Sequence, residues 1–189
     1  MSNHASNVAN PAPLGLLGFG MTTILLNLHN AEIISLSVVI ISMGLLLGGF
    51  AQIIAGIMEF RIGNTFGAIA FTAYGSFWLS LVGIWVLPSA IPQGGVQSAD
   101  EISMGFYLLL WGIFSMCMFI CTFKHNVITR IVFGSVTLLF FLLALADFTG
   151  SHFIKVIAGY EGIFCGASAF YSSVGQIFKH EFQREILKM

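Results

Sequence analysis

The clearest indication of the chain's architecture is the stretch IISLSVVIISMGLLLGGFAQIIAGIM (33–58), which is predominantly apolar and carries no charge. A membrane-spanning helix needs about 20 consecutive, mostly apolar residues, and this stretch is long enough to cross a bilayer. The rest of the chain has the same character, because 57% of its 189 residues are hydrophobic and 8% are charged. A soluble domain carries about 25% charged residues. The composition therefore indicates an integral membrane protein, and the net charge of −1 gives no argument for nucleic acid as a partner.

Five further apolar runs predict membrane-spanning helices, which makes the fold class an all-α integral membrane protein with a six-helix bundle. The separators between the runs are short, and only residues 88–102, with two prolines and a Gly-Gly pair, are long enough for a real loop. No linker could separate two membrane domains. We therefore expect one transmembrane domain over 13–178, with tails at 1–12 and 179–189. The six predicted spans are 13–30, 33–58, 65–88, 103–123, 128–147 and 155–178.

The distribution of basic residues predicts how the bundle is oriented. Six helices place both termini on one side of the membrane, and lysine and arginine concentrate on the cytoplasmic side of membrane proteins. The other side holds only Lys155. Both termini are therefore expected in the cytoplasm of a cell that carries this protein in its inner membrane, with the 88–102 loop outside. The basic residues on the predicted cytoplasmic side are Arg61, Lys124, Arg130, Lys179, Arg184 and Lys188.

Few residues in the predicted spans could carry acid–base or metal chemistry. The central parts of the first five spans contain no Lys, Arg, Asp or Glu, and the histidines lie in the tail or at helix ends. Ionisable groups inside a membrane usually mark proton or ion sites, and the candidates are Lys155 and Glu161, both near the outer end of the last span. Counting back from the end of that span places Glu161 at the membrane interface, as a solvated rim residue. The sequence predicts no catalytic residue, no metal site and no cofactor.

The polar residues that remain inside the membrane are neutral. Serine and threonine in helices often bond their own backbone, whereas Asn27 and Gln52 are more costly to bury without a partner. An aromatic stripe at Phe71, Tyr74 and Trp78 follows helical spacing. Such a stripe fits either the packed core or an aromatic constriction that admits only small solutes.

Several blocks together resemble the acetate uptake transporter family, and most of all its bacterial succinate–acetate permeases. The blocks are NPAPLGLLGFGMTTILLNLHN (10–30), GNTFG (63–67), FTAYGSFW (71–78), LWGIF (110–114) and CGASAFY (165–171). The resemblance covers nearly the whole chain. Its signature is the first six residues of the first block, namely Asn10, Pro11, Ala12, Pro13, Leu14 and Gly15.

The resemblance implies a six-helix protomer, a hexameric assembly and the passage of acetate and succinate through each protomer. Carried over by motif, the family's hydrophobic constriction corresponds to Phe19, Tyr74 and Val136, with Ala169 as a small neighbouring position. Relatives commonly have leucine at the third position, so a slightly wider path is expected here. The outer loop, the KHN turn (124–126) and Glu161, which stands where relatives carry an apolar residue, depart from the family pattern.

A carboxylate that crosses without a buried cation needs help from dipoles, which helix N-termini and neutral polar groups provide. Asn10 is suited to cap the first helix, whose prolines lie where a helix start tolerates them. Channel and proton symport both stay open, as do two other classes of protein: the substrate-binding subunit of a vitamin transporter, and a membrane scaffold or enzyme. The expected polar stations of the acetate path are Asn10, Thr22, Thr23, Asn27, Thr72, Ser76 and Ser135.

Overall fold

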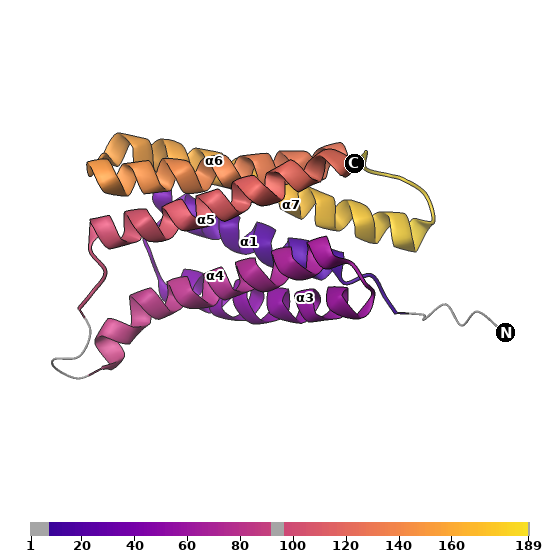
Figure 1. The fold of residues 1–189 in the computed structure, drawn as a ribbon, viewed down its shortest axis with the longest axis horizontal. Helices are drawn as coiled ribbons and strands as arrows, with labels where there is room; N and C mark the ends of the chain where they lie inside the picture. Colours follow the sequence, from indigo (N-terminus) through magenta and orange to yellow (C-terminus); the bar gives the residue numbers. More distant parts are fainter. Residues whose placement is uncertain (1–7, 92–96, 189) are drawn as a thin grey trace.

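The structure, a computed structural model, describes residues 8–91 and 97–188. It is all-helical, and six of its helical segments are long and apolar enough to cross a membrane (Figure 1). Parts of the predicted tails (1–7 and 189) and of the predicted outer loop (92–96) lie outside the described residues. The segments are Ala12–Asn30 (α1), Val38–Arg61 (α2, η1 and α3), Thr65–Ala90 (α4), Glu101–Lys124 (α5 and η2), Val127–Thr149 (α6) and His152–Phe182 (α7).

The six predicted spans are all present, and two of them have ends that differ from the prediction by three residues or more. The second span begins at Val38, because the backbone of Glu32 is left-handed (φ 62°) and Ser37 is extended. The apolar residues 33–36 therefore belong to a connection that the hydropathy pattern did not separate from the helix. The last span is longer at both ends than the predicted 155–178. The division into tails and one transmembrane domain stays a prediction.

The second span is not a uniform α-helix. Val38–Met43 (α2) continues into the π-helical segment Gly44–Ala51 (η1), and Gln52–Arg61 (α3) completes the span. A π-helix bonds residue i to i+5 and appears frequently at functional sites. Here Gly48 lies so close to Trp78 and Thr22 that a Cβ atom would fall within 2.9 Å of each. The irregular segment thus lets this span pack tightly while Gln52 directly follows it.

The signature segment forms the start of α1. The helix begins at Ala12, and Pro11 stands at its N-cap position. Asn10 accepts a hydrogen bond from the Ala12 amide at 3.1 Å and donates one to Gln176 of α7 at 3.1 Å. Asn10 therefore both satisfies a free amide at the helix start and ties α1 to α7.

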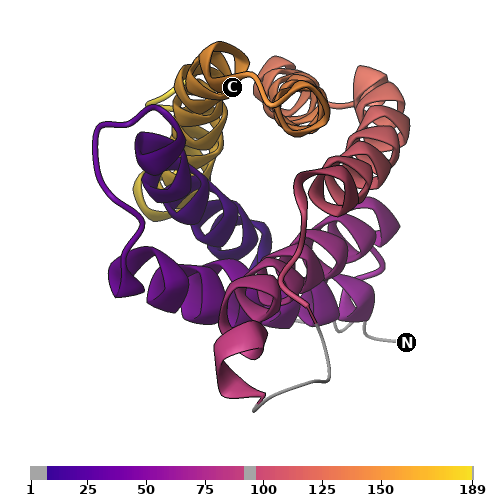
Figure 2. The ribbon, with the colours of Figure 1, turned by 90° about the vertical axis from the view of Figure 1, so that its left-hand side faces the viewer.

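The helices surround a common interior when the bundle is viewed end-on (Figure 2). α1 packs against α7, which packs against α6, and α6 packs against α5, while α3 and η1 lie between α1 and α4. The α1–α7 contact is a close approach of backbones, because a Cβ atom on Gly166 would fall 2.7 Å from the Gly20 oxygen and the Ile24 nitrogen. The glycine-rich faces are thus packing surfaces. α4 meets α5 mainly through side chains, as in the 2.8 Å hydrogen bond between Tyr74 and Ser115.

Candidate functional site

Three helices contribute one continuous lining to the interior of the bundle. Residues three or four apart lie on the same face of a helix, and the residues that line two successive cavities follow that spacing on α1, α4 and α6. The two cavities therefore lie along one path through the bundle. The lining residues on these faces include Leu16, Phe19, Leu26 and Asn30 of α1, Ala70, Tyr74, Phe77, Leu81 and Trp85 of α4, and Val132, Val136, Leu143 and Asp147 of α6.

The narrower cavity is the constriction, which contains the three residues predicted for it, Phe19, Tyr74 and Val136. Its volume is about 20 Å³, and a cavity needs at least about 10–15 Å³ to hold one water molecule. The constriction therefore has room for roughly one water molecule in this conformation. Its other lining residues are Leu16, Gln52, Ala70, Phe71, Val132 and Phe133.

Aromatic packing fixes the position of Tyr74, which is buried. Its ring lies 5.6 Å from that of Phe19 and is stacked 6.4 Å from that of Phe140, measured between centroids. Its hydroxyl shares a 2.8 Å hydrogen bond with Ser115, so the polar end of the side chain is satisfied by the protein. Tyr74 consequently presents ring surface, rather than a free hydroxyl, to the constriction.

Gln52 is the exception in this apolar lining. Its side chain is 1% exposed, and neither its Nε2 nor its Oε1 has a hydrogen-bond partner among the described residues. A buried polar group without a partner costs about 1–3 kcal/mol. Gln52 lies in the wall of the constriction, but its amide atoms are buried within that wall, and the surface that the cavity exposes is apolar.

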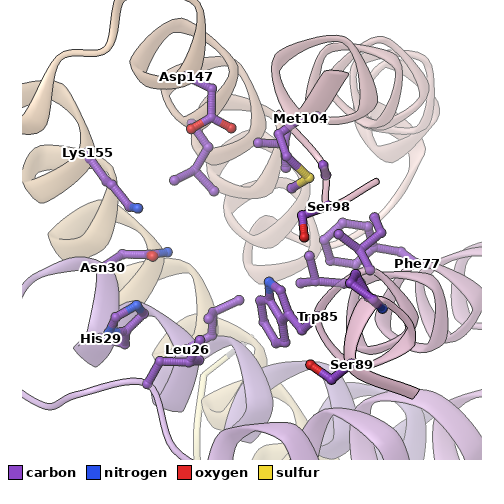
Figure 3. A pocket seen from close by; sticks show the side chains of 17 residues that line it. Leu26, His29, Asn30, Phe77, Trp85, Ser89, Ser98, Met104, Asp147 and Lys155 are labelled. Atoms are coloured by element: carbon purple, nitrogen blue, oxygen red, sulfur yellow. The ribbon is translucent and has the colours of Figure 1, made fainter. Parts of the chain in front are cut away.

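The wider cavity, here called the vestibule, has a volume of about 470 Å³ and lies at the end of the bundle where α1, α4 and α6 end (Figure 3). Its inner part is apolar, with Leu26, Phe77 and Leu81. Its polar lining comes from five different segments. These residues are His29 and Asn30 of α1, Ser89 of α4, Ser98 of the segment before α5, Asp147 of α6 and Lys155 of α7.

The residues predicted as polar stations are spread over several environments. Thr22, Thr23 and Asn27 are buried. The Thr22 hydroxyl donates a hydrogen bond to the Gly18 carbonyl at 2.6 Å, and the Asn27 amide donates one to the Thr23 carbonyl at 2.9 Å. Ser76 is exposed and bonds the backbone of its own helix. Thr72 faces Gly56 at the α3–α4 contact. None of these five residues lines the two cavities described above; their role in the path stays a prediction.

Two other predicted residues have defined places. Ala169 is fully buried in the same apolar cluster as Phe19, Tyr74 and Val136. Ser135 points away from the constriction and donates a hydrogen bond to Glu161 of α7. Ser135 and Glu161 line a groove of about 470 Å³ on the outside of α6 and α7.

The prediction that Glu161 is a solvated rim residue was wrong. Glu161 lies about 14 Å along α7 from His152, at 1.5 Å per residue. Its hydrogen-bond partner is Ser135, which directly precedes Val136 in α6. Its Oε2 atom is buried and has no hydrogen-bond partner among the described residues. Glu161 therefore lies at the depth of the constriction. Counting residues misplaced it because α7 begins earlier than predicted.

Sequence reasoning missed three residues of the lining. Gln52 was recognised as costly to bury but not assigned to the path, and the signal for it was an amide in the middle of an uncharged span. Asn30 and Asp147 stand at predicted helix ends, where polar residues are ordinary. Only the arrangement of the helices shows that they face one cavity. In the described part of the chain, no three His, Cys, Asp or Glu side chains gather in a way that could hold a metal ion.

Comparisons with known proteins agree with this arrangement. The model of the GPR1/FUN34/yaaH family matches residues 1–184. The chain is 48% identical to the "Succinate-acetate/proton symporter SatP" of Escherichia coli K12, over 96% of this chain and 95% of that protein. It is 32% identical to "Acetate permease A" of Emericella nidulans, over 93% of this chain and 64% of the relative. A solved "Structure of the bacterial acetate channel SatP" superposes with a TM-score of 0.93 at 48% identity, covering 97% of this chain and 99% of that one.

Proposed function

Because the chain belongs to the GPR1/FUN34/yaaH family, we propose that it moves acetate and related small carboxylates, including succinate, across a membrane. The observation that carries this proposal is the path itself, in which a wide polar vestibule leads to a constriction with room for roughly one water molecule in this conformation. The family resemblance read from the sequence is confirmed by the family match. The substrate class is that of two SatP relatives, one described as a succinate-acetate/proton symporter and the other as an acetate channel.

The constriction suits a small carboxylate for a physical reason. A long apolar passage excludes ions because an unpaired charge is costly to remove from water. Gln52 lies in the wall of this passage with an amide that has no hydrogen-bond partner among the described residues, and a rotation of its side chain would present that amide to the cavity. Its amide can donate to a carboxylate oxygen, while the aromatic rings of Phe19 and Tyr74 border the methyl group. A longer acid would have to pass the same constriction with more of its surface dehydrated.

The assembly and orientation are part of the same proposal. Each protomer has its own path, six protomers form a hexamer, and both termini lie in the cytoplasm. The bias of basic residues towards the side of the termini supports this orientation. The many apolar side chains exposed on the outside of the bundle are available to lipid and to neighbouring protomers.

The test is exchange of labelled acetate by the purified protein in liposomes, with acetate, succinate and a larger acid compared. We expect Val136→Phe to abolish acetate exchange, because a phenyl ring exceeds the space in a cavity of about 20 Å³. The matched control is Val39→Phe, since Val39 is exposed on the outside of the bundle. Exchange by wild-type protein that equals that of empty liposomes would overturn the proposed function.

A second arm of the assay separates the two transport mechanisms. Net uptake of acetate is measured with an imposed pH gradient and again after the gradient is collapsed. Proton symport requires uptake to fall when the gradient is removed. Uptake that follows the acetate gradient alone indicates a channel.

A further inference from the structure

Lys155 has an unusual position for a membrane protein with so few charges. It lies in the first turn of α7 and lines the vestibule, and its side chain points towards the interior of that cavity (Figure 3). No carboxylate of residues 8–91 or 97–188 lies within ion-pair distance of its ammonium group. Among those residues, the ion pair at this end of the bundle, Glu32 with His152, leaves Lys155 out. A cation without an ion pair therefore lines the vestibule, where the charge of Asp147 is its electrostatic neighbour.

Two α1 side chains beside Lys155 are held in fixed orientations. Asn30 is buried and donates a 3.0 Å hydrogen bond to Asn27, and His29 bonds the Ile34 carbonyl at 3.2 Å through Nδ1. Asn30 and Lys155 come from different helices and lie on the same wall of the vestibule (Figure 3). The opposite wall holds the ring of Trp85, with Ser89 and Ser98 near it (Figure 3). A carboxylate on the first wall would thus have its hydrocarbon part facing that ring.

Asp147 adds a charge of the other sign to the same cavity. It belongs to the last turn of α6 and lines the vestibule together with Lys155. The vestibule thus has one cation and one anion in a volume of about 470 Å³. A molecule with a single negative charge can approach the cation, whereas a second carboxylate on the same molecule would meet the field of Asp147.

We propose that Lys155 and Asn30 form a carboxylate-binding station in the vestibule and that Asp147 makes this station selective for monoanions over dianions. Acetate binds at this station in the vestibule first, and the constriction then excludes larger acids. It rests on the proposed transport function and adds to it the site of capture and the charge selectivity. Succinate with both carboxyl groups ionised, its state near neutral pH, is the disfavoured form.

The experiment uses liposomes with equal acetate concentrations on both sides, so that the direction in which the protein inserts does not affect tracer exchange. We expect Lys155→Gln to raise the acetate concentration at half-maximal exchange by about 3- to 10-fold, because a focused charge raises the local concentration of its counter-ion. Lys155→Arg should retain the wild-type value. Lys124→Gln, at the opposite end of the bundle, is the control for the loss of one positive charge.

The salt dependence of exchange separates an electrostatic role of Lys155 from a structural one. If Lys155 had only a structural role, its replacement would not alter this dependence. Raising the ionic strength from about 0.01 M to about 0.15 M shortens the screening length from about 30 Å to about 8 Å. The half-maximal concentration of the wild type should rise over this range, and that of Lys155→Gln should change little. Equal values and equal salt dependence for Lys155→Gln and Lys124→Gln would overturn the station while leaving transport intact. Absence of exchange by the wild type would overturn the proposed function itself.

The selectivity is tested separately with Asp147→Asn. The ratio of succinate to acetate exchange near neutral pH should rise by about 3-fold or more when the opposing charge is removed. Asp100→Asn is the control, because Asp100 lies at the same end of the bundle but does not line the vestibule. A ratio that stays at the wild-type value in Asp147→Asn would contradict the role of Asp147.

Discussion

Gln52 has two polar atoms that folding leaves without a partner among the described residues. An apolar side chain at this position would give a more stable protein, because an unsatisfied buried polar group lowers the free energy of unfolding. Gln176, by contrast, is tied to both Asn10 and Ser172. The two glutamines therefore differ in that Gln176 is hydrogen-bonded within the protein, whereas the amide of Gln52 is not.

We expect Gln52→Leu to lower acetate exchange by about tenfold or more, the equivalent of about 1.4 kcal/mol in binding free energy. The same change should leave the free energy of unfolding unchanged or raise it by about 1–3 kcal/mol, since it removes unsatisfied atoms. Exchange in liposomes and thermal unfolding in detergent measure the two effects. Gln176→Leu should instead lower the melting temperature. A loss of stability in Gln52→Leu would mean that its amide is satisfied within the protein.

The helices themselves were predictable wherever an apolar run ended at a charge or a glycine. α4 and α6 begin within one residue of the predicted positions, because Asn64 and Asn126 cap them by accepting hydrogen bonds from backbone amides. The start of the second span was not predictable, because residues 33–36 are as apolar as the helix that follows. The π-helical turn of η1 also leaves no trace in hydropathy, which depends on composition and not on the hydrogen-bond pattern.

Close backbone packing between α1 and α7 gives a testable consequence for stability. Gly166→Ala should lower the free energy of unfolding by about 1–3 kcal/mol, because the new methyl group would meet backbone atoms of α1 that cannot rotate away. Thermal unfolding of the purified protein measures the change. The matched control is Gly83→Ala, where the nearest atom lies at an ordinary 3.6 Å. That change should be neutral or slightly stabilising, as alanine is the better helix former.

The start of α5 depends on an exposed carboxylate. Asp100 accepts hydrogen bonds from the Ser103 amide at 2.7 Å and from the Ser103 hydroxyl at 2.9 Å, and these bonds lower the pKa of Asp100 below its ordinary value. A carboxyl whose pKa is lowered by folding stabilises the folded state above its unfolded pKa of about 3.9. This stabilisation is lost as the pH falls through the lower, folded pKa.

We therefore expect Asp100→Ala to lower the melting temperature near neutral pH, with a difference from wild type that shrinks as the pH falls below about 4. Melting curves recorded over this pH range test the expectation. Asp100→Asn should lose less, because asparagine also caps helices well. A difference that stays constant down to the lowest pH would show that the charge has no part in the cap.

For the whole molecule, the sequence predicted the number of spans and the family. The three residues predicted for the constriction line one small cavity, and their role in transport stays a prediction. The path between vestibule and constriction could not be predicted in the same way, because it arises where faces of α1, α4 and α6 meet. Hydropathy identifies each helix but does not give its rotation about its own axis. For this reason several serines and threonines that were predicted as polar stations do not line either of the two cavities, while Gln52 and Lys155 do.

The orientation of the whole bundle has its own test. Ser98 and Arg184 are exposed and lie on opposite sides of the predicted membrane. In intact cells, Ser98→Cys should react with a thiol reagent that does not cross membranes, above the labelling of the parent chain. Arg184→Cys should react only after the cells are permeabilised. The reverse pattern would place the vestibule in the cytoplasm.

The small volume of the constriction also bears on the energy supply of the cell. Protons cross membranes rapidly along unbroken chains of hydrogen-bonded water, which pass them from one molecule to the next. A cavity of about 20 Å³ has room for roughly one water molecule, which is too few for such a chain to form across the apolar lining. A protein built in this way can stay permanently accessible to a carboxylate without short-circuiting the proton gradient that drives the synthesis of ATP.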